Sequence, residues 1–168
     1  MQRLRAGLFG ALAALLLPLC AAATEGPQAA APDELATVER LLSAVNAMRA
    51  EHGLPQLHLD PTLQGLSQDY ARLMAEADCL SHDCAGRGAV GQRARAQGYD
   101  YLLIGEALAG GPPDAETVVQ LWMTSEPHRA VLLHGEVRDV GGGYVYRSED
   151  GGAAPYGHYW VLTVGLTP

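Results

Sequence analysis

Two short stretches near the C-terminus decide the fold class: residues 140–147 read VGGGYVYR and residues 158–165 read HYWVLTVG. Valine, threonine and aromatic residues dominate both stretches, and these residue types favour strands. The segment between them contains Asp150-Gly151, a pair typical of turns. We therefore predict an antiparallel hairpin. Because helical patterns precede it without alternating with strands, the order indicates an α+β protein.

Three helices are predicted before this hairpin from apolar residues spaced three and four apart. The first spans residues 33–52, the second starts at Asp60-Pro61, and the third starts after Asp114. Their apolar stripes are Leu35, Val38, Leu41, Leu42, Val45 and Met48; Leu63, Leu66, Tyr70, Leu73 and Met74; and Val118, Leu121 and Trp122. Weaker patterns predict short helices at residues 90–97 and 125–133 and an extended segment at residues 99–109.

The composition excludes several classes of partner. The chain has 11 arginines, no lysine and 19 acidic residues, which gives a net charge of −8. Nucleic-acid-binding proteins carry a basic surface, so we expect no nucleic-acid partner. An anionic membrane surface is a poor partner for the same reason. With 48% apolar and 18% charged residues, the 168-residue chain has the usage of one ordinary globular domain.

The N-terminus has the pattern of a secretory signal. Two arginines, a short apolar run and an alanine-rich end make up residues 1–23, so we expect cleavage before Thr24 and a flexible leader at residues 24–34. The alternative is a lipoprotein anchored through Cys20, but Leu19 is large where a small residue should stand. The mature chain is therefore expected to be secreted or periplasmic, without a transmembrane segment.

The cysteine count agrees with this cleavage. Removal of residues 1–23 leaves Cys79 and Cys84, with four residues between them in a short loop. A disulfide is expected outside the cytosol. Two cysteines alone are a weak zinc pattern, because structural zinc sites need four ligands.

Three polar residues stand out as candidates for chemistry. His82 lies between the two cysteines, and Glu106 interrupts an apolar run in which an unpaired carboxylate would be costly. His128 falls in the first turn of a predicted helix, whose dipole favours the neutral imidazole that binds metals or accepts protons. Three further histidines, His52, His58 and His134, are expected to lie on the surface.

Four segments resemble the bacterial branch of the CAP superfamily, which contains cysteine-rich secretory proteins, antigen 5 and plant pathogenesis-related 1 proteins. These are residues 45–54 (VNAMRAEHGL), Ser81-His82, Gly105-Glu106 and residues 125–133 (SEPHRAVLL). The similarity covers residues 38–165 and sets the expected CAP-like domain at residues 35–168. It implies a three-layer α-β-α sandwich around a small antiparallel sheet.

The resemblance also implies a cleft lined by two histidines and two acidic residues. Its histidines match His82 and His128, and one acid matches Glu106. The second acid falls at Ser125, which is followed by Glu126, so the tetrad is incomplete; Ser125 is better explained as a helix cap. Ala107 stands where the family often has an asparagine. Asn46 and Arg49 are expected to form hydrogen bonds within the helical layer. Trp122, Tyr144 and Trp160 are expected in the core.

The leading function hypothesis is a secreted binding or interaction module for a small molecule, a lipid or a protein. In this hypothesis the cleft of His82, Glu106 and His128 can hold a divalent metal such as zinc. The alternative is a metal-dependent hydrolase that uses the same three residues, since three protein ligands leave one position for water. No activated nucleophile is evident in the sequence, which favours the binding module.

Overall fold

The computed structural model describes residues 33–148 and 156–168. The predicted signal at residues 1–23, almost all of the predicted leader and the predicted turn at Asp150-Gly151 lie outside these residues. None of the helices in the described ranges has the length and apolar character needed to cross a membrane.

The helices and the hairpin lie where the sequence places them. In chain order the elements are α1 (Glu34–Glu51), β1 (His58–Leu59), α2 (Pro61–Glu76), the one-turn helix η1 (Cys84–Gly86), α3 (Val90–Ala96), β2 (Leu103–Gly110), α4 (Ala115–Thr124), α5 (Glu126–Leu132), β3 (Asp139–Tyr146) and β4 (His158–Leu166). The side chains of Asp33, Asp60 and Asp114 accept hydrogen bonds from the first backbone N–H groups of α1, α2 and α4. These caps fix where the three helices begin.

The four strands form one sheet in the order β1-β3-β4-β2. β4 pairs antiparallel with both β3 and β2, which confirms the hairpin and the expected α+β class. To the expected small antiparallel sheet the structure adds one short strand, since β1 pairs parallel with β3. The N–H of His58 donates to the carbonyl of Arg138 at 2.8 Å. A strand of two residues is too short to show an alternating pattern, so the sequence gives no sign of it.

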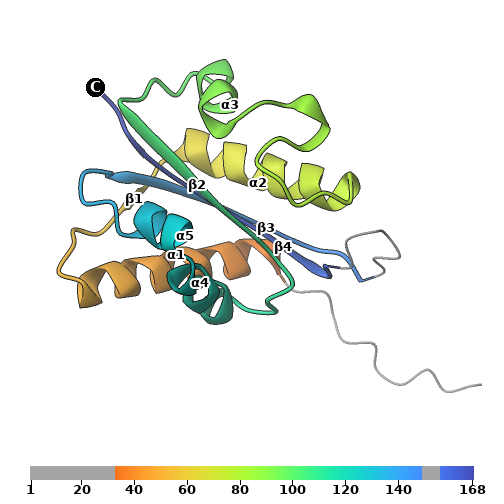
Figure 1. Cartoon of the computed structure of the whole chain (residues 1–168), viewed down its shortest axis with the longest axis horizontal. Coiled ribbons are helices and arrows are strands. Elements are labelled where there is room, and N and C mark those ends of the chain that lie inside the picture. Colours follow the sequence, from red (N-terminus) through yellow and green to blue (C-terminus); the bar gives the residue numbers. More distant parts are fainter. Residues whose placement is uncertain (1–32, 149–155) are drawn as a thin grey trace, which may run out of the picture. The chain divides into compact units, whose positions relative to one another are not determined.

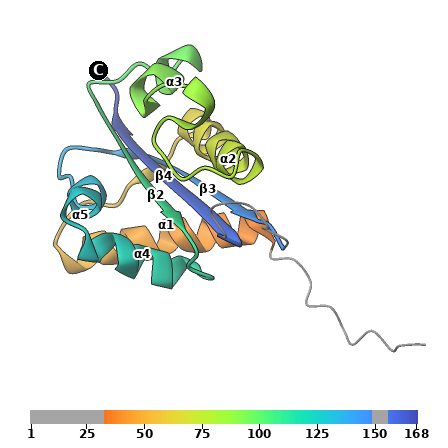
Figure 2. The same cartoon turned by 45° about the vertical axis from the view of Figure 1, so that its right-hand side comes forward.

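Helices cover both faces of the sheet, so the expected three-layer sandwich is confirmed. In Figures 1 and 2, α1, α4 and α5 lie on one side of the strands, and α2 and α3 lie on the other. Successive residues of β4 alternate between the two cores. Trp160 and Leu162 pack with α1 and α4, whereas Tyr159 and Val161 pack with α2.

Glycines in β3 let α2 lie directly on the sheet. A Cβ atom at Gly141 would stand 2.1 Å from the backbone carbon of Leu63, and one at Gly143 would stand 2.1 Å from the backbone oxygen of Ser67. Real side chains cannot approach that closely, so these positions have to be glycine. The close contact fixes the position of α2, which carries Tyr70 toward the candidate site.

Most of the predicted core is confirmed. Trp122, Tyr144 and Trp160 are fully buried. The prediction is wrong for two leucines: Leu35 is 67% exposed and Leu121 is 46% exposed. Both stand at the margin of an apolar stripe, where helical spacing alone does not separate the buried face from its edge.

Candidate functional site

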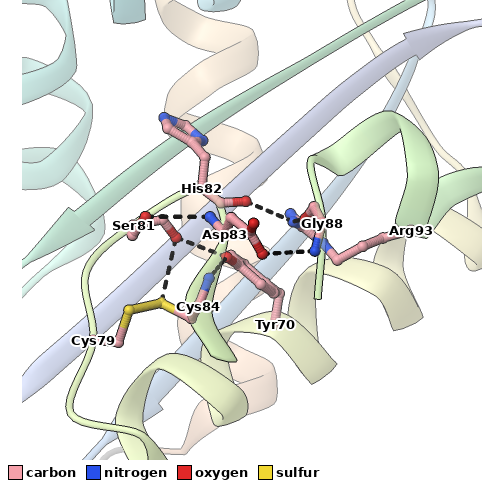
Figure 3. Close-up of a disulfide and its surroundings, with 8 residues drawn as sticks. All are labelled: Tyr70, Cys79, Ser81, His82, Asp83, Cys84, Gly88 and Arg93. Carbon is pink, nitrogen blue, oxygen red and sulfur yellow. Dashed lines mark hydrogen bonds between the residues drawn. A yellow bond between two sulfur atoms is a disulfide. The ribbon is translucent and has the colours of Figure 1, made fainter. Parts of the chain in front are cut away.

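A disulfide-closed loop after α2 carries His82. The expected Cys79–Cys84 disulfide is present, with the two Cα atoms 6.0 Å apart. The hydroxyl of Tyr70 ties the loop to α2: it donates to the carbonyl of Ser81 at 2.7 Å and accepts from the N–H of Cys84 at 2.9 Å. Figure 3 shows that the imidazole of His82 lies on the side of the loop away from the two sulfur atoms. The disulfide therefore restrains the loop and leaves the imidazole available.

Glu106 has a partner for each carboxylate oxygen. It lies in β2, and its side chain is 2% exposed. Its Oε1 accepts from Nδ1 of His82 at 2.8 Å, and its Oε2 accepts from the guanidinium of Arg93. The sequence analysis predicted a partner for this carboxylate, and the structure shows two: the imidazole of His82 and the guanidinium of Arg93.

Arg93, in α3, is the functional residue that the sequence analysis missed. Its side chain is 9% exposed. Besides Glu106, it donates to the backbone carbonyls of His82, at 2.8 Å, and Gly88. Its guanidinium carbon stands 3.5 Å from the centre of the Tyr70 ring, which is a cation–π contact. The buried Glu106 was the one signal that could have pointed to a buried cation.

The electrostatics of the two candidate histidines differ. The hydrogen bond to Glu106 raises the pKa of His82 above 6.5, against the smaller opposing effects of burial and of the positive charge of Arg93. Burial lowers the pKa of His128, and the charge of His82 adds to that effect. His82 therefore retains its proton at a pH where His128 has lost its own.

The helix α5 positions His128. Arg49, fully buried in α1, donates to the carbonyls of Leu132 at 2.7 Å and His134 at 3.1 Å, and so fixes the end of this helix against α1. This confirms the structural role expected of Arg49. His128 is half-buried in the first turn of α5. Its imidazole lies near enough to His82 for their charges to interact.

Ser125 and Glu126 precede His128 at the start of α5. Ser125 occupies the N-cap position of α5 as expected, although its side chain makes no capping hydrogen bond. Its backbone carbonyl accepts instead from the N–H of Arg129, at 2.8 Å. Glu126 is exposed to solvent. The three histidines expected on the surface, His52, His58 and His134, are indeed exposed.

The donor set does not fit the expected metal ion. Among residues 33–148 and 156–168, no three histidine, cysteine, aspartate or glutamate side chains are placed to hold a metal. The physical reason lies at Glu106, whose oxygens already face the imidazole of His82 and the guanidinium of Arg93. A metal approaching this carboxylate would meet a buried positive charge.

Comparisons with known proteins agree with this architecture. The protein YkwD of Bacillus subtilis is 30% identical over 116 residues, which are 68% of this chain and 45% of YkwD, so the chain spans less than half of that relative. An outer surface protein of Borrelia burgdorferi has a similar structure, with a TM-score of 0.70, 22% identity and coverage of 79% of this chain and 94% of that chain.

An extracellular protein of Bacillus anthracis that contains an SCP domain is also similar in structure, with a TM-score of 0.68 and 24% identity. That likeness covers 79% of this chain and 41% of that chain. The sequence model of the cysteine-rich secretory protein family matches residues 42–164, inside the expected domain. The match takes in His82, Glu106 and His128 together with both layers of helices, and the chain belongs to the CAP family.

Proposed function

We propose that this chain is an exported binding module in which the imidazole of His82 contacts the ligand. The observation that supports this proposal is that the exposed imidazole of His82 is hydrogen-bonded to Glu106, which is buried and paired with the buried Arg93. The side chain of His82 is 57% exposed, whereas those of Glu106 and Arg93 behind it are 2% and 9% exposed. Burial of two charged groups is costly unless they are paired, and here they orient a third group toward solvent.

The chemistry of the ligand follows from the free nitrogen of His82. Nδ1 donates to Glu106, so Nε2 is the atom left for a ligand. With the pKa of His82 raised, Nε2 carries a proton in mildly acidic solution and donates to an anionic or strongly accepting oxygen. We infer that the small molecule, lipid or protein that binds here presents such an oxygen to His82 and His128.

Sulfate is a suitable probe, because its charge does not change between pH 6 and pH 8. The imidazole resonances of His82 and His128 should shift on addition of sulfate at pH 6, and the shift should be lost at pH 8 and in His82→Gln. His52→Gln is the matched control, since this exposed histidine lies at the end of α1 and donates through Nδ1 to the carbonyl of Met48. Absence of any shift at pH 6 would contradict the binding role of His82.

The hydrolase alternative loses its support with the metal, because the described donor set does not form a metal site. Fold alone does not restore it, since one fold hosts many functions. A calorimetric titration with zinc should show no binding that depends on His82 or His128. Stoichiometric zinc binding lost in His128→Ala would overturn this and reopen the hydrolase.

Export is the second part of the proposal. We infer that residues 1–23 are removed and that Thr24 begins the mature chain. The disulfide between Cys79 and Cys84 supports an oxidising compartment, and two similar structures belong to proteins described as extracellular or as outer surface proteins. Mass spectrometry of the exported protein should give the mass of a chain that starts at Thr24, and a lipid on Cys20 would contradict it.

A further inference from the structure

A groove of about 540 Å³ lies between α2 and α3, and Arg93 is one of the residues that line it. This volume is in the range of small-molecule sites. Leu66, Leu73 and Ala96 give it an apolar wall, and the side chains of Gln92 and Gln97 add amide groups. Nothing in the proposed function of His82 uses this groove.

The lining of the groove holds more arginines than acids, although the chain as a whole is acidic. Three of its lining residues are arginines, Arg72, Arg87 and Arg93, although the whole chain has a net charge of −8. Two acids, Asp69 and Glu76, also line it. Asp69 is neutralised by Arg72, whose guanidinium approaches it to 3.5 Å.

Arg87 is the cation of the groove that is available to a ligand. It is exposed, and within the described ranges it forms no ion pair with an acidic side chain. Arg93, which also lines the groove, is nine-tenths buried, and its Nε has no hydrogen-bond partner in the described part of the chain. A buried donor without a partner is rare in folded proteins and is often found where a ligand binds.

We propose that the groove between α2 and α3 is a second ligand site, which takes a small organic carboxylate. A guanidinium binds a carboxylate through two parallel hydrogen bonds, so Arg87 supplies the anchor. The charge of Arg93 is paired with Glu106, but its buried Nε has no hydrogen-bond partner in the described part of the chain and is available to donate to the ligand. The amides of Gln92 and Gln97 and the wall of Leu66 and Leu73 suit a carboxylate that bears an amide and a short apolar group.

Three probes with one skeleton test the charge of the ligand. N-acetyl-L-alanine is an anion, N-acetyl-L-alanine amide is neutral, and L-alanine amide is a cation. In backbone amide NMR spectra at pH 7 and low salt, the anion should shift the signals of Leu73, Arg87 and Gln92. The neutral probe should bind at least about tenfold more weakly, because it lacks the charged hydrogen bonds.

Variants locate the site. Arg87→Gln should weaken binding of N-acetyl-L-alanine by about tenfold or more, as expected for loss of one charged pair. Arg40→Gln, a matched change of an exposed arginine in α1 outside the groove, should leave it unchanged. His82→Gln should weaken binding much less than Arg87→Gln does, which separates this site from the one proposed at His82. Equal binding of the three probes, tighter binding of the cation, or no effect of Arg87→Gln would overturn the assignment.

Discussion

Replacement of Arg93 by methionine tests how the candidate site is held together. Methionine keeps much of the length of the side chain but donates no hydrogen bonds. The change removes a charged pair whose two side chains are 9% and 2% exposed, and so leaves the carboxylate of Glu106 with one partner. Breaking a buried pair on one side costs about 3–5 kcal/mol. Because both groups are buried, solvent screening does not reduce this value much.

The same change should alter the titration of His82 in a defined direction. The charge of Arg93 lowers the pKa of His82, while the hydrogen bond to Glu106 raises it. Without Arg93 the lowering effect is lost and the raising effect of Glu106 remains, so the pKa of His82 should rise further above 6.5. The group then stabilises the folded state fully below pH 6.5, and this contribution is lost as the pH rises through the higher, folded-state pKa.

Urea unfolding at pH 7 and NMR titration of the His82 imidazole measure the two effects. Arg95→Met is the matched control on α3: Arg95 is exposed, its guanidinium lies 4.3 Å from the centre of the Tyr101 ring, and its loss should cost less than about 1 kcal/mol. The double variant Arg93→Met/Glu106→Gln should lose less stability than the sum of the single changes. A loss below about 1 kcal/mol in Arg93→Met, or a pKa of His82 that stays or falls, would refute the reasoning.

Three further outcomes are expected. Serine at both Cys79 and Cys84 should lower the free energy of unfolding by about 2 kcal/mol, because the loop they close is short; free-thiol labelling of the native protein should first show no reactive cysteine. Gly143→Ala should cost about 3 kcal/mol or more in urea unfolding, because its Cβ would overlap backbone of α2, whereas Gly65→Ala, in open space on α2, should cost nothing or add up to about 1 kcal/mol. His128 should titrate below pH 6.5 by NMR, and its contribution to stability should be present above pH 6.5 and be lost as the pH falls toward the lowered pKa; a midpoint above 6.5 would contradict its burial.

The helices and the hairpin could be predicted because local chemistry determines them. Asp33, Asp60 and Asp114 cap helices whose apolar residues recur at helical spacing. β1 could not be predicted, because two residues carry no periodic pattern. Its pairing depends on where the chain after α1 meets β3.

The candidate site was predictable only in part. Glu106 lies in an apolar run, where an unpaired carboxylate would be costly, so a partner could be predicted. The resemblance to the CAP family pointed to His82. Arg93 gave no signal of its own, because α3 is seven residues long and the sequence marks it as a weak helix. Its contacts arise only after the disulfide loop folds back over Tyr70, which places the carbonyls of His82 and Gly88 in front of the guanidinium. Such a contact depends on tertiary structure and not on spacing along the chain.

Arg93 belongs to both proposed sites, and this has a thermodynamic consequence. It pairs with Glu106 on the side of His82, and it lines the groove that contains Arg87. An anion bound at Arg87 would offset part of the positive charge that lowers the pKa of His82, so it should raise the affinity of His82 for a proton. Because coupling between two binding equilibria is reciprocal, protonation of His82 should in turn strengthen carboxylate binding in the groove. On this reasoning the two sites respond to pH together, although α3 and the disulfide loop separate them.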